Sequence, residues 1–375
     1  MLDKSTRERF DWFLFITLCL IVAVGVMFIW SAKSFGFAKR QLIWTGIAMA
    51  VFFSLLKINY LAIAQFAYVF YGIGVLGLLF VLIPHNPLAP TINGANRWIT
   101  LGVVNVQPSE FTKIAVVLAL AKYLMYRKNY RTLPGLIGPF AFAMLPIVLI
   151  LKEPDLGTSL VFLPILFVLL FVAGAKLWHL LTIIGLGVAA CPILYLFVME
   201  PYQQDRIKAF LDPAKYSSST AYQLNQSLIA IGSGGFFGKG WSRGTQNLLD
   251  RVPEPHTDFI FSVIGEEIGF AGSSFVLLLY FVLLLCGIGI ARRTREPCGR
   301  LIAMGVVTMF AMQVLVNVGM TIGIAPITGM TLPFISYGGS SLVASFLALS
   351  LVMNVAMRRT PVLAAGDFEF NDENS

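Results

Sequence analysis

The chain has 375 residues, of which 57% are hydrophobic and 12% are charged, and its mean hydropathy is +0.80. Soluble domains carry about twice that share of charged residues, so the composition excludes a soluble globular protein and indicates an integral membrane protein. The formal net charge of +8 is spread over the connections between apolar runs, so it is a topology signal and gives no reason to expect nucleic acid as a partner.

Apolar runs long enough to cross a bilayer recur along the whole chain. Only helices and closed barrels satisfy all backbone groups in lipid, and a helix needs about 20 apolar residues to span it. We therefore predict an all-α, polytopic integral membrane protein with about ten transmembrane helices. The predicted spans are Trp12–Ser31, Gln41–Leu56, Tyr60–Ile83, Ser109–Tyr126, Gly135–Leu151, Thr158–Gly174, Leu177–Met199, Thr257–Ala291, Leu301–Ile324 and Tyr337–Met357.

The eighth span is too long for one straight crossing. It contains either a polar turn at its start and an extension at its end, or a kink near Gly269 and Gly272. A large connection, residues 201–256, precedes it. Within that connection Ser219–Ile231 has the apolar spacing of a short surface helix, and the glycines that follow suit either a moving loop or tight turns.

Basic residues predict the orientation. Lys4, Arg7 and Arg9 precede a first span that is too long for a secretory signal and lacks a cleavage site, so we interpret it as a retained anchor. Placing the N-terminus in the cytoplasm puts most Lys and Arg on the cytoplasmic side, as in the segment 292–300. An even number of spans then returns the C-terminus to the cytoplasm.

The predicted domain organisation follows from this topology. Residues 1–360 form a single transmembrane domain, in which the connection 201–256 is extracytoplasmic. Residues 361–375 form a short, acidic cytoplasmic tail.

The most polar stretch of the chain lies at the start of the eighth span, around Asp258. An ionisable group at the boundary between water and lipid is costly unless it is paired or used. The simplest explanation is a helix start, because a carboxylate in the first turn complements the helix dipole. Glu266 and Glu267 lie deeper in the same span, and we interpret them as polar contacts within or between helices.

The connection before the fourth span is also polar. Arg97 and Trp98 form an interfacial pair, which is equally typical of a membrane-surface anchor. Ser109 is predicted to cap the fourth span. Glu110 and Lys113 are three residues apart, so they lie on one helix face and are close enough to pair.

Two further helix entrances on the same predicted side contribute Asp155, Ser336 and Ser340. Separate helix caps do not need to fall on one membrane face. A shared extracytoplasmic cavity for a polar or anionic headgroup does require its polar residues to lie on one membrane face. The gathering of polar helix starts on one face therefore favours a binding site over independent caps.

Six motifs together resemble the SEDS proteins of bacteria, and the resemblance covers nearly all of the chain, from Trp12 to Met357. They are Pro253-Glu-Pro-His-Thr-Asp-Phe-Ile-Phe, Gly265-Glu-Glu-Ile-Gly, Gly94-Ala-Asn-Arg-Trp, Gln107-Pro-Ser-Glu-Phe-Thr-Lys, Glu153-Pro-Asp-Leu-Gly-Thr and Ile335-Ser-Tyr-Gly-Gly-Ser-Ser. The segment Gly240-Trp-Ser-Arg-Gly-Thr-Gln is more similar to the elongation branch of the family, RodA, than to the division branch, FtsW.

The resemblance implies a peptidoglycan glycosyltransferase that polymerises lipid II at the outer face of the bacterial cytoplasmic (inner) membrane, for cell elongation and rod shape. It implies that Asp258 is the catalytic carboxylate. It also maps the family's paired Glu and Lys onto Glu110 and Lys113. Together with polar residues of the motifs and helix entrances, they form the predicted substrate-binding set: Arg97, Glu110, Lys113, Asp155, His256, Thr257, Ser336 and Ser340. A single displacement would invert the donor carbon, and Glu266 lies too deep to serve as the second carboxylate of a retaining route.

Asp258 has two open roles, general base or ligand of a divalent cation, Mg²⁺ or Mn²⁺. The resemblance also implies a partner, a single-pass class B penicillin-binding protein that cross-links the new strands. The rival interpretation is a lipid-linked sugar flippase or ion-coupled transporter, but the charged groups lie toward one face and no internal repeat is found. A structural membrane partner of the cell-wall machinery is a third interpretation.

Overall fold

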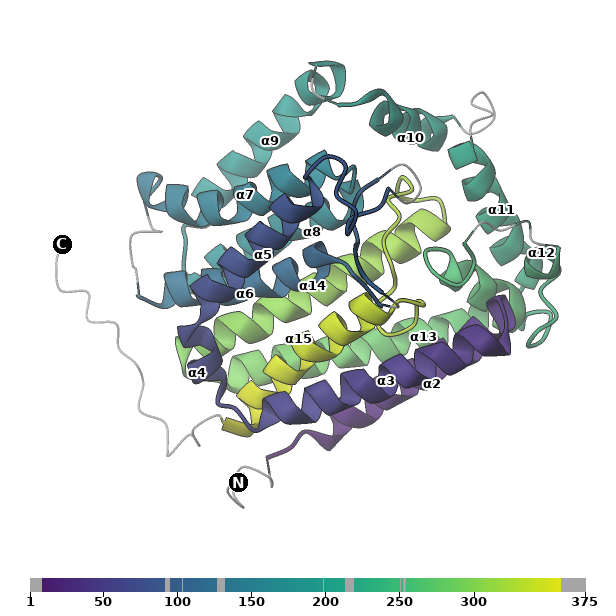
Figure 1. The fold of residues 1–375 in the computed structure, drawn as a ribbon, viewed down its shortest axis with the longest axis horizontal. Coiled ribbons are helices and arrows are strands. Elements are labelled where there is room, and N and C mark those ends of the chain that lie inside the picture. The colour runs from purple at the N-terminus through teal and green to yellow at the C-terminus, as the bar shows by residue number, and fades with distance from the viewer. Residues whose placement is uncertain are drawn as a thin grey trace.

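The computed structural model describes residues 9–91, 95–102, 104–126, 132–197, 199–212, 219–249, 251 and 254–358. The predicted tail 361–375 lies outside these residues. Within them the regular secondary structure is helical apart from one small hairpin, which confirms the predicted all-α polytopic fold (Figure 1). The elements are α2 (Trp12–Ala32), α3 (Phe35–Leu56), α4 (Tyr60–Gln65), α5 (Ala67–Val81), β1 (Ile99–Leu101), β2 (Val104–Val106), α6 (Pro108–Tyr126), η2 (Pro134–Leu136), α7 (Ile137–Lys152), α8 (Leu156–Ala173), α9 (Leu177–Phe197), α10 (Pro201–Leu211), α11 (Ser219–Gly234), α12 (Thr245–Leu248), α13 (Ile260–Arg293), α14 (Pro297–Thr321) and α15 (Gly339–Arg358).

Each predicted span corresponds to a helix or a helix pair. Among the described helices, seven are both long and apolar enough to cross a membrane: α2, α7 with its preceding 3₁₀ turn, α8, α9, α13, α14 and α15. Two further spans, α3 and α6, carry charged residues near their starts. The third span is not the continuous helix that we predicted, because the backbone breaks at Phe66 between α4 and α5.

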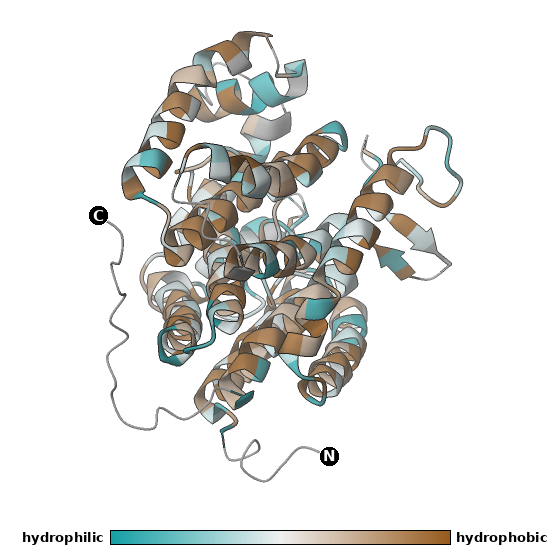
Figure 2. Ribbon diagram, turned by 90° about the vertical axis from the view of Figure 1, so that its left-hand side faces the viewer, coloured by the Kyte–Doolittle hydropathy of each residue, from teal (hydrophilic) through white to brown (hydrophobic). Residues whose placement is uncertain are grey.

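Helices α6, α14 and α15 are largely buried and lie inside the bundle. Helix α3 packs along α15, and α14 packs against α6, α8 and α13. Figure 2 shows hydrophobic residues running along the helices, with hydrophilic residues at several helix ends and turns. A membrane bundle buries its core against itself and exposes apolar side chains to lipid, and the exposed leucines and phenylalanines of α5 and α9 fit this expectation.

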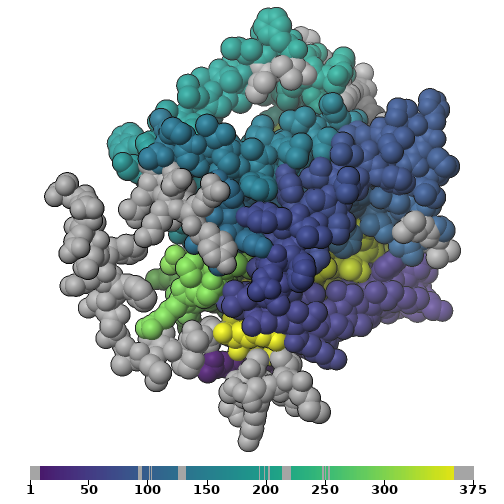
Figure 3. Space-filling view, turned by 60° about the vertical axis from the view of Figure 1, so that its left-hand side comes forward, coloured from purple at the N-terminus to yellow at the C-terminus, as the bar shows by residue number. Residues whose placement is uncertain are grey.

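The segment from α9 to α11 stands at the edge of the molecule. Helix α9 is almost entirely exposed and packs only lightly, against α8. In Figure 3 this segment forms a rim along the top, with an opening between it and the body. Helix α11, which the sequence predicted over Ser219–Ile231, returns to the bundle and packs on α13.

Helix α13 is kinked at Gly269, which confirms the predicted kink. Gly269 has φ +65°, a conformation that glycine adopts without steric cost. At this point the segment 235–240 inserts into the hydrogen-bond ladder of the helix. Phe270 N donates to Gly235 O at 2.9 Å, and Lys239 N donates to Glu266 O at 3.0 Å. The backbone groups freed by the kink are therefore satisfied by the loop, as buried backbone groups must be.

The glycines of this loop are required by close backbone contact. A Cβ atom on Gly238, which has φ +80°, would lie 2.2 Å from Glu267 O, and one on Gly234 would lie 2.0 Å from Gly265 O. Of the two open explanations, tight turns therefore describe this segment. Its docking orients the first turns of α13, and Asp258 immediately precedes them.

The start of α6 differs from the prediction. The helix begins at Pro108, so Ser109 lies inside the first turn and does not cap it, and its buried Oγ has no partner among the described residues. Proline is favoured at the first helical position because its missing N–H needs no partner there. That preference outweighs the capping preference of serine.

Candidate functional site

The backbone of Asp258 is held by α14. Asn317, fully buried on that helix, donates from Nδ2 to Asp258 O at 2.9 Å and to Met330 O at 2.6 Å. One amide thus ties the start of α13 to the loop before α15. The sequence analysis did not single out Asn317, although an amide inside an apolar span is a signal for an interhelical hydrogen bond.

The preceding two residues are held by the loop before α15. Ser336 Oγ donates to Thr257 O at 2.6 Å, and Tyr337 N donates to His256 O at 2.9 Å. The side chain of Ser336 therefore helps to fix the backbone at Thr257. Their assignment as substrate-binding residues stays a prediction.

Asp258 is only partly buried and does not cap α13. The capping position is Phe259, one residue later, and it makes no side-chain capping hydrogen bond. In the part of the chain that the structure describes, no hydrogen bond involves the Asp258 carboxylate oxygens. The helix-start explanation places Asp258 in the first turn of the helix, whereas it precedes the capping residue, so the geometry disfavours that explanation. A Cβ on Gly329 would lie 3.4 Å from Asp258 Oδ2, which places the turn at Gly329 against the carboxylate.

Burial and, to a smaller extent, the negative charges of Glu254 and Asp155 raise the pKa of Asp258, and the net value is about 6. Arg97 and Arg206 act in the opposite direction. These effects link Asp258 to Arg97 and Asp155, two residues that the sequence predicted for the same site. Arg206, on α10, was not predicted, because its helix lies within the long connection and carries no motif of its own.

Asp155 is the N-cap residue of α8, and Gln107 connects it to the starts of α6 and α15. It accepts hydrogen bonds from Thr158 N at 3.0 Å and from Thr158 Oγ1 at 2.9 Å, so it caps its helix. Gln107 Nε2 lies 3.5 Å from Asp155 Oδ2, and Gln107 N donates to Ser340 Oγ at 3.0 Å. Three helix entrances therefore meet at this end of the bundle, as the convergence of polar residues predicted.

Arg97 reaches the turn between α7 and α8 from the connection before β1. Its Nε donates to Glu153 O at 2.9 Å, and its Nη2 donates to Pro154 O. The carboxyl group of Glu153 is buried and neither oxygen has a partner among the described residues. Burial raises the pKa of Glu153 to about 9, and the charge of Asp155 adds to the effect while Arg97 opposes it. Glu153 is therefore neutral at pH 7.

Glu110 and Lys113 form a buried ion pair on α6, with Lys113 Nζ 2.9 Å from Glu110 Oε1. The pairing agrees with their spacing in the sequence. The pair begins three residues after Gln107. The structure describes no contact between it and Asp258, so its substrate-binding role stays a prediction.

His256 lies in an aromatic cluster. Its ring centroid is 5.0 Å from that of Phe37 and 5.5 Å from that of Tyr337. Burial lowers the pKa of His256; the negative charge of Glu254 opposes this effect, and the positive charge of Lys33 adds to it. The ring is therefore neutral at pH 7, and its predicted substrate contact is not tested by these contacts.

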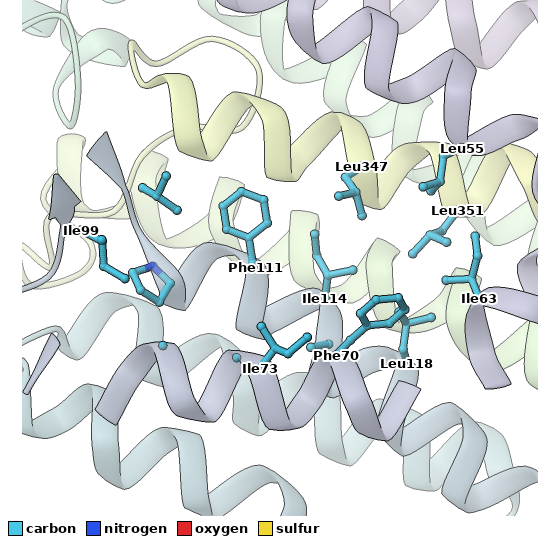
Figure 4. Close-up of a pocket in the computed structure, with 15 residues that line it drawn as sticks. Leu55, Ile63, Phe70, Ile73, Ile99, Phe111, Ile114, Leu118, Leu347 and Leu351 are labelled. Carbon is cyan, nitrogen blue, oxygen red and sulfur yellow. The ribbon is translucent and has the colours of Figure 1, made fainter. Parts of the chain in front are cut away.

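An apolar cavity of about 540 Å³ runs along the other face of α6, between α5 and α15 (Figure 4). Phe111 and Ile114, each of which directly follows one member of the ion pair in the sequence, point into it (Figure 4). Pro108 lines it as well, so it extends to the turn that holds Gln107. A slot with this lining suits a hydrocarbon chain.

The fold and site together define a polytopic membrane protein in which Arg97, Asp155 and Asp258 gather at one end of the bundle, beside an apolar cavity. The family model described as "Cell cycle protein", which covers FtsW, RodA and SpoVE, matches residues 9–361. The chain therefore belongs to the FtsW/RodA/SpoVE family, the SEDS proteins, as its motifs predicted.

Relatives and solved structures agree with this membership. The chain is 36% identical to stage V sporulation protein E of Bacillus subtilis over 95% of this chain and 99% of the relative. It is 37% identical to peptidoglycan glycosyltransferase MrdB of Escherichia coli K12, over 96% and 98%. The crystal structure of Thermus thermophilus rod shape determining protein RodA matches with a TM-score of 0.71 and 33% identity, over 94% of this chain and 98% of that one. A chain from "Structural coordination of polymerization and crosslinking by a peptidoglycan synthase complex" matches with a TM-score of 0.80 and 34% identity, over 92% and 97%.

Proposed function

We propose that this protein is a peptidoglycan glycosyltransferase that polymerises lipid II, the disaccharide-pentapeptide carried on undecaprenyl pyrophosphate, during cell elongation. The observation that carries the proposal is that Asp258 is only partly buried and its carboxylate has no hydrogen-bond partner among the described residues, while Asn317 fixes its backbone. A rigid backbone with a free carboxylate is the arrangement that a catalytic group needs. Relatives named peptidoglycan glycosyltransferase, MrdB among them, support the reaction class.

The site faces outward from the bacterial cytoplasmic (inner) membrane, and both termini lie in the cytoplasm. Support comes from α13, which starts beside Asp258 and ends at Arg293. After the kink at Gly269, its remaining residues rise about 35 Å, enough to cross a hydrocarbon core. The helix ends in Arg292 and Arg293, and Arg295 follows, so the positive-inside rule places that end in the cytoplasm.

The apolar cavity beside α6 holds the polyprenyl chain of the substrate. Its lining is almost wholly hydrocarbon, with Phe111, Ile114 and Leu118 on one side and Leu347 and Leu351 on the other. It leads to the end of the bundle at which α6, α8 and α15 begin. A lipid held there presents its headgroup to the polar end of the bundle.

Asp258 acts as the general base in a single displacement. The carboxylate accepts the proton of the acceptor 4-hydroxyl while that oxygen bonds to the donor anomeric carbon. The bond from that carbon to the pyrophosphate oxygen breaks, so undecaprenyl pyrophosphate leaves and the carbon is inverted. A base works best when its pKa lies near the working pH, and a pKa of about 6 keeps Asp258 ionised at pH 7.

A retaining route would need a second carboxylate about 5 Å from the first. Glu266 is not available for this role, because its Oε1 accepts hydrogen bonds from Lys239 Nζ at 2.7 Å and from Gln246 N at 3.0 Å. Glu267 accepts a hydrogen bond from Ser31 on α2. Both carboxylates join α13 to neighbouring segments, as we predicted for them.

The departing pyrophosphate needs positive charge. Arg97 and Arg206 act electrostatically on Asp258 and so lie within range of the reacting centre. A divalent cation, Mg²⁺ or Mn²⁺, would add charge stabilisation when bound. The described residues contain no group of three or more His, Cys, Asp or Glu that could hold a metal. Mg²⁺ commonly binds one or two carboxylates together with substrate phosphates, and the open carboxylate of Asp258 fits that mode.

The test is Asp258→Asn in purified protein with labelled lipid II. The amide keeps the shape and loses the charge, so we expect lipid II binding to persist and polymer formation to stop. A helix cap would tolerate this change, because Asn and Asp rank together at caps. Wild-type activity should fall as the pH drops through about 6, where Asp258 becomes protonated. Normal glycan chains from folded Asp258→Asn protein would refute the assignment and reopen the flippase interpretation.

A chelator separates the two roles of Asp258. If Asp258 holds a cation, wild-type polymerisation requires added Mg²⁺ or Mn²⁺ and stops with EDTA. If it acts only as a base, activity persists in EDTA.

We also propose that the protein works with a class B penicillin-binding protein, a transpeptidase that cross-links the new strands. One matched chain comes from a synthase complex that coordinates polymerization and crosslinking, which supports the pairing. Co-purification with a transpeptidase of the same cell, and faster polymerisation in its presence, would be the expected result. A polymerase indifferent to every such transpeptidase would contradict it.

A further inference from the structure

A second cavity, of about 340 Å³, lies at the opposite end of α13 from Asp258, between that helix and the start of α2. The residues that line it are Asp11, Phe13, Val282, Leu285, Cys286, Gly289, Ile290 and Arg293. Val282, Cys286, Gly289 and Arg293 are spaced three or four apart, so they form one face of α13. A Cβ on Gly289 would meet nothing within 4 Å, so the missing side chain leaves room at this point.

The cavity carries one side chain of each charge. Asp11 caps α2 by accepting a hydrogen bond from Leu14 N at 3.0 Å, and this bond uses only its Oδ1. Arg293 is exposed in the last turn of α13. In the described part of the chain no ion pair joins Asp11 to Arg293, so each charge is available to a ligand.

The depth of the cavity matches the headgroup region of a bilayer. Trp12 is 65% exposed beside Asp11, and tryptophan collects at the membrane interface. Phe13 and Leu285, which line the cavity, are 64% and 48% exposed and therefore face hydrocarbon. A ligand that occupies this place has an apolar body and a polar head that meets both charges.

We propose that this cavity binds a phospholipid whose headgroup carries a primary ammonium, such as phosphatidylethanolamine. Arg293 binds the phosphate through charge-assisted hydrogen bonds, and Asp11 accepts a hydrogen bond from the ammonium. The upper parts of the acyl chains lie against Phe13, Val282 and Leu285. The orientation proposed above places this lipid in the inner leaflet.

The charges discriminate among common phospholipids. A choline headgroup has no N–H to donate, so it loses the hydrogen bond to Asp11. A glycerol headgroup carries no positive charge. Arg293 would still bind the phosphate, but Asp11 would have no ammonium group to contact. A lipid that bridges both residues joins α2 to α13, and it stabilises the folded protein by mass action.

The test uses the full-length chain, purified in detergent, with Cys286 as the only cysteine after replacement of Cys19, Cys191 and Cys298 by Ala. Phosphatidylethanolamine, phosphatidylcholine and phosphatidylglycerol with identical acyl chains are added in turn. The rate at which a small apolar maleimide labels Cys286 reports whether the cavity is filled. The melting temperature is followed in parallel.

Four variants locate the contacts. Asp11→Asn keeps a capping side chain but removes the charge. Arg293→Gln removes the phosphate ligand. Arg292→Gln is the matched control, because Arg292 is exposed in the same turn but does not line the cavity. Gly289→Leu fills the cavity with no change of charge.

We expect phosphatidylethanolamine to slow labelling of Cys286 and raise the melting temperature in the parent and in Arg292→Gln. Arg293→Gln should weaken this protection about tenfold, as expected for the loss of a charge-assisted hydrogen bond. Asp11→Asn should abolish the preference over phosphatidylcholine, and Gly289→Leu should give slow labelling without any lipid.

Equal protection by all three lipids in the parent would overturn the proposal. Stronger protection by phosphatidylglycerol would also overturn it, because the site would then select a net negative charge. Protection by a transpeptidase but by no phospholipid would assign the cavity to a partner helix. If Asp11→Asn does not fold, Arg293→Gln and Gly289→Leu decide the matter, since unchanged lipid protection in both would refute the site.

Discussion

The buried ion pair on α6 predicts strong coupling between two substitutions. Glu110 and Lys113 are 6% and 1% exposed, and their charged atoms lie 2.9 Å apart. We expect Glu110→Gln and Lys113→Met each to destabilise the protein, because each leaves one charge buried without a partner. The double variant should be more stable than the sum of the two losses implies.

The expected magnitude has a ceiling. A buried charge without a partner can be neutralised by a change of protonation state. At pH 7, deprotonating an ordinary lysine costs about 4.6 kcal/mol and protonating an ordinary glutamate costs about 3.7 kcal/mol. These limits agree with the range of about 3–5 kcal/mol for breaking a buried pair. The double variant leaves no stranded charge, so the coupling energy should exceed about 2 kcal/mol, well above the scatter of independent sites.

The assay is a double-mutant cycle on the free energy of unfolding, measured by SDS titration in mixed micelles. The chain offers a matched control on α10, where Asp205 and Lys208 have the same spacing, lie 3.7 Å apart and have side chains that are 60% and 35% exposed. That exposed pair should couple by only about 0.3–0.5 kcal/mol. Additive losses at Glu110 and Lys113, equal within error to the control cycle, would refute the reasoning.

Three further outcomes are expected. Because burial raises the pKa of Glu153 to about 9, the folded chain retains a proton that the unfolded chain releases, so stability decreases as the pH rises from about 4.5 to about 9. Glu153→Gln should therefore increase the free energy of unfolding at pH 7 by up to about 3 kcal/mol, with a higher melting temperature, and should increase it less at pH 5. A variant that is less stable than the wild type at pH 7 would contradict this. Gly238→Ala forces a side chain into a left-handed backbone in contact with α13 and should cost more than about 1–2 kcal/mol. Gly232→Ala, in open space on α11, should cost nothing, and equal melting of the two variants would disprove the close contact. For the orientation, cysteine at Asp205 should react with an impermeant maleimide in intact cells of a cysteine-free background, and cysteine at Arg295 should not; the reverse pattern would invert the topology.

Much of the fold follows from local sequence. Span length and apolar content are properties of consecutive residues, so ten helical segments could be located from hydropathy alone. The kink at Gly269 was predictable because glycine and excess length occur together. Local signals also compete, and this is why the cap predicted at Ser109 was wrong, since the neighbouring Pro108 favours the first helical position more strongly.

Part of the site was predictable for the same reason. Asp258, Asp155 and Arg97 stand out as charges at helix entrances, where a charge is costly and therefore informative. The pairing of Glu110 with Lys113 follows from helical spacing within one segment. None of these inferences requires knowledge of which helices are neighbours.

Tertiary structure alone decided what surrounds these residues. Asn317 holds the backbone of Asp258 from a position 59 residues away, and the carboxyl of Glu153 is buried with no hydrogen-bond partner among the described residues. The glycine-rich loop completes the backbone hydrogen bonds of α13 at its kink. Periodicity and spacing describe which face a residue occupies, but not which segment meets that face. Contacts between distant segments depend on how ten helices pack together, so the environment of the site, and with it the pKa of Asp258, emerges only in the folded chain.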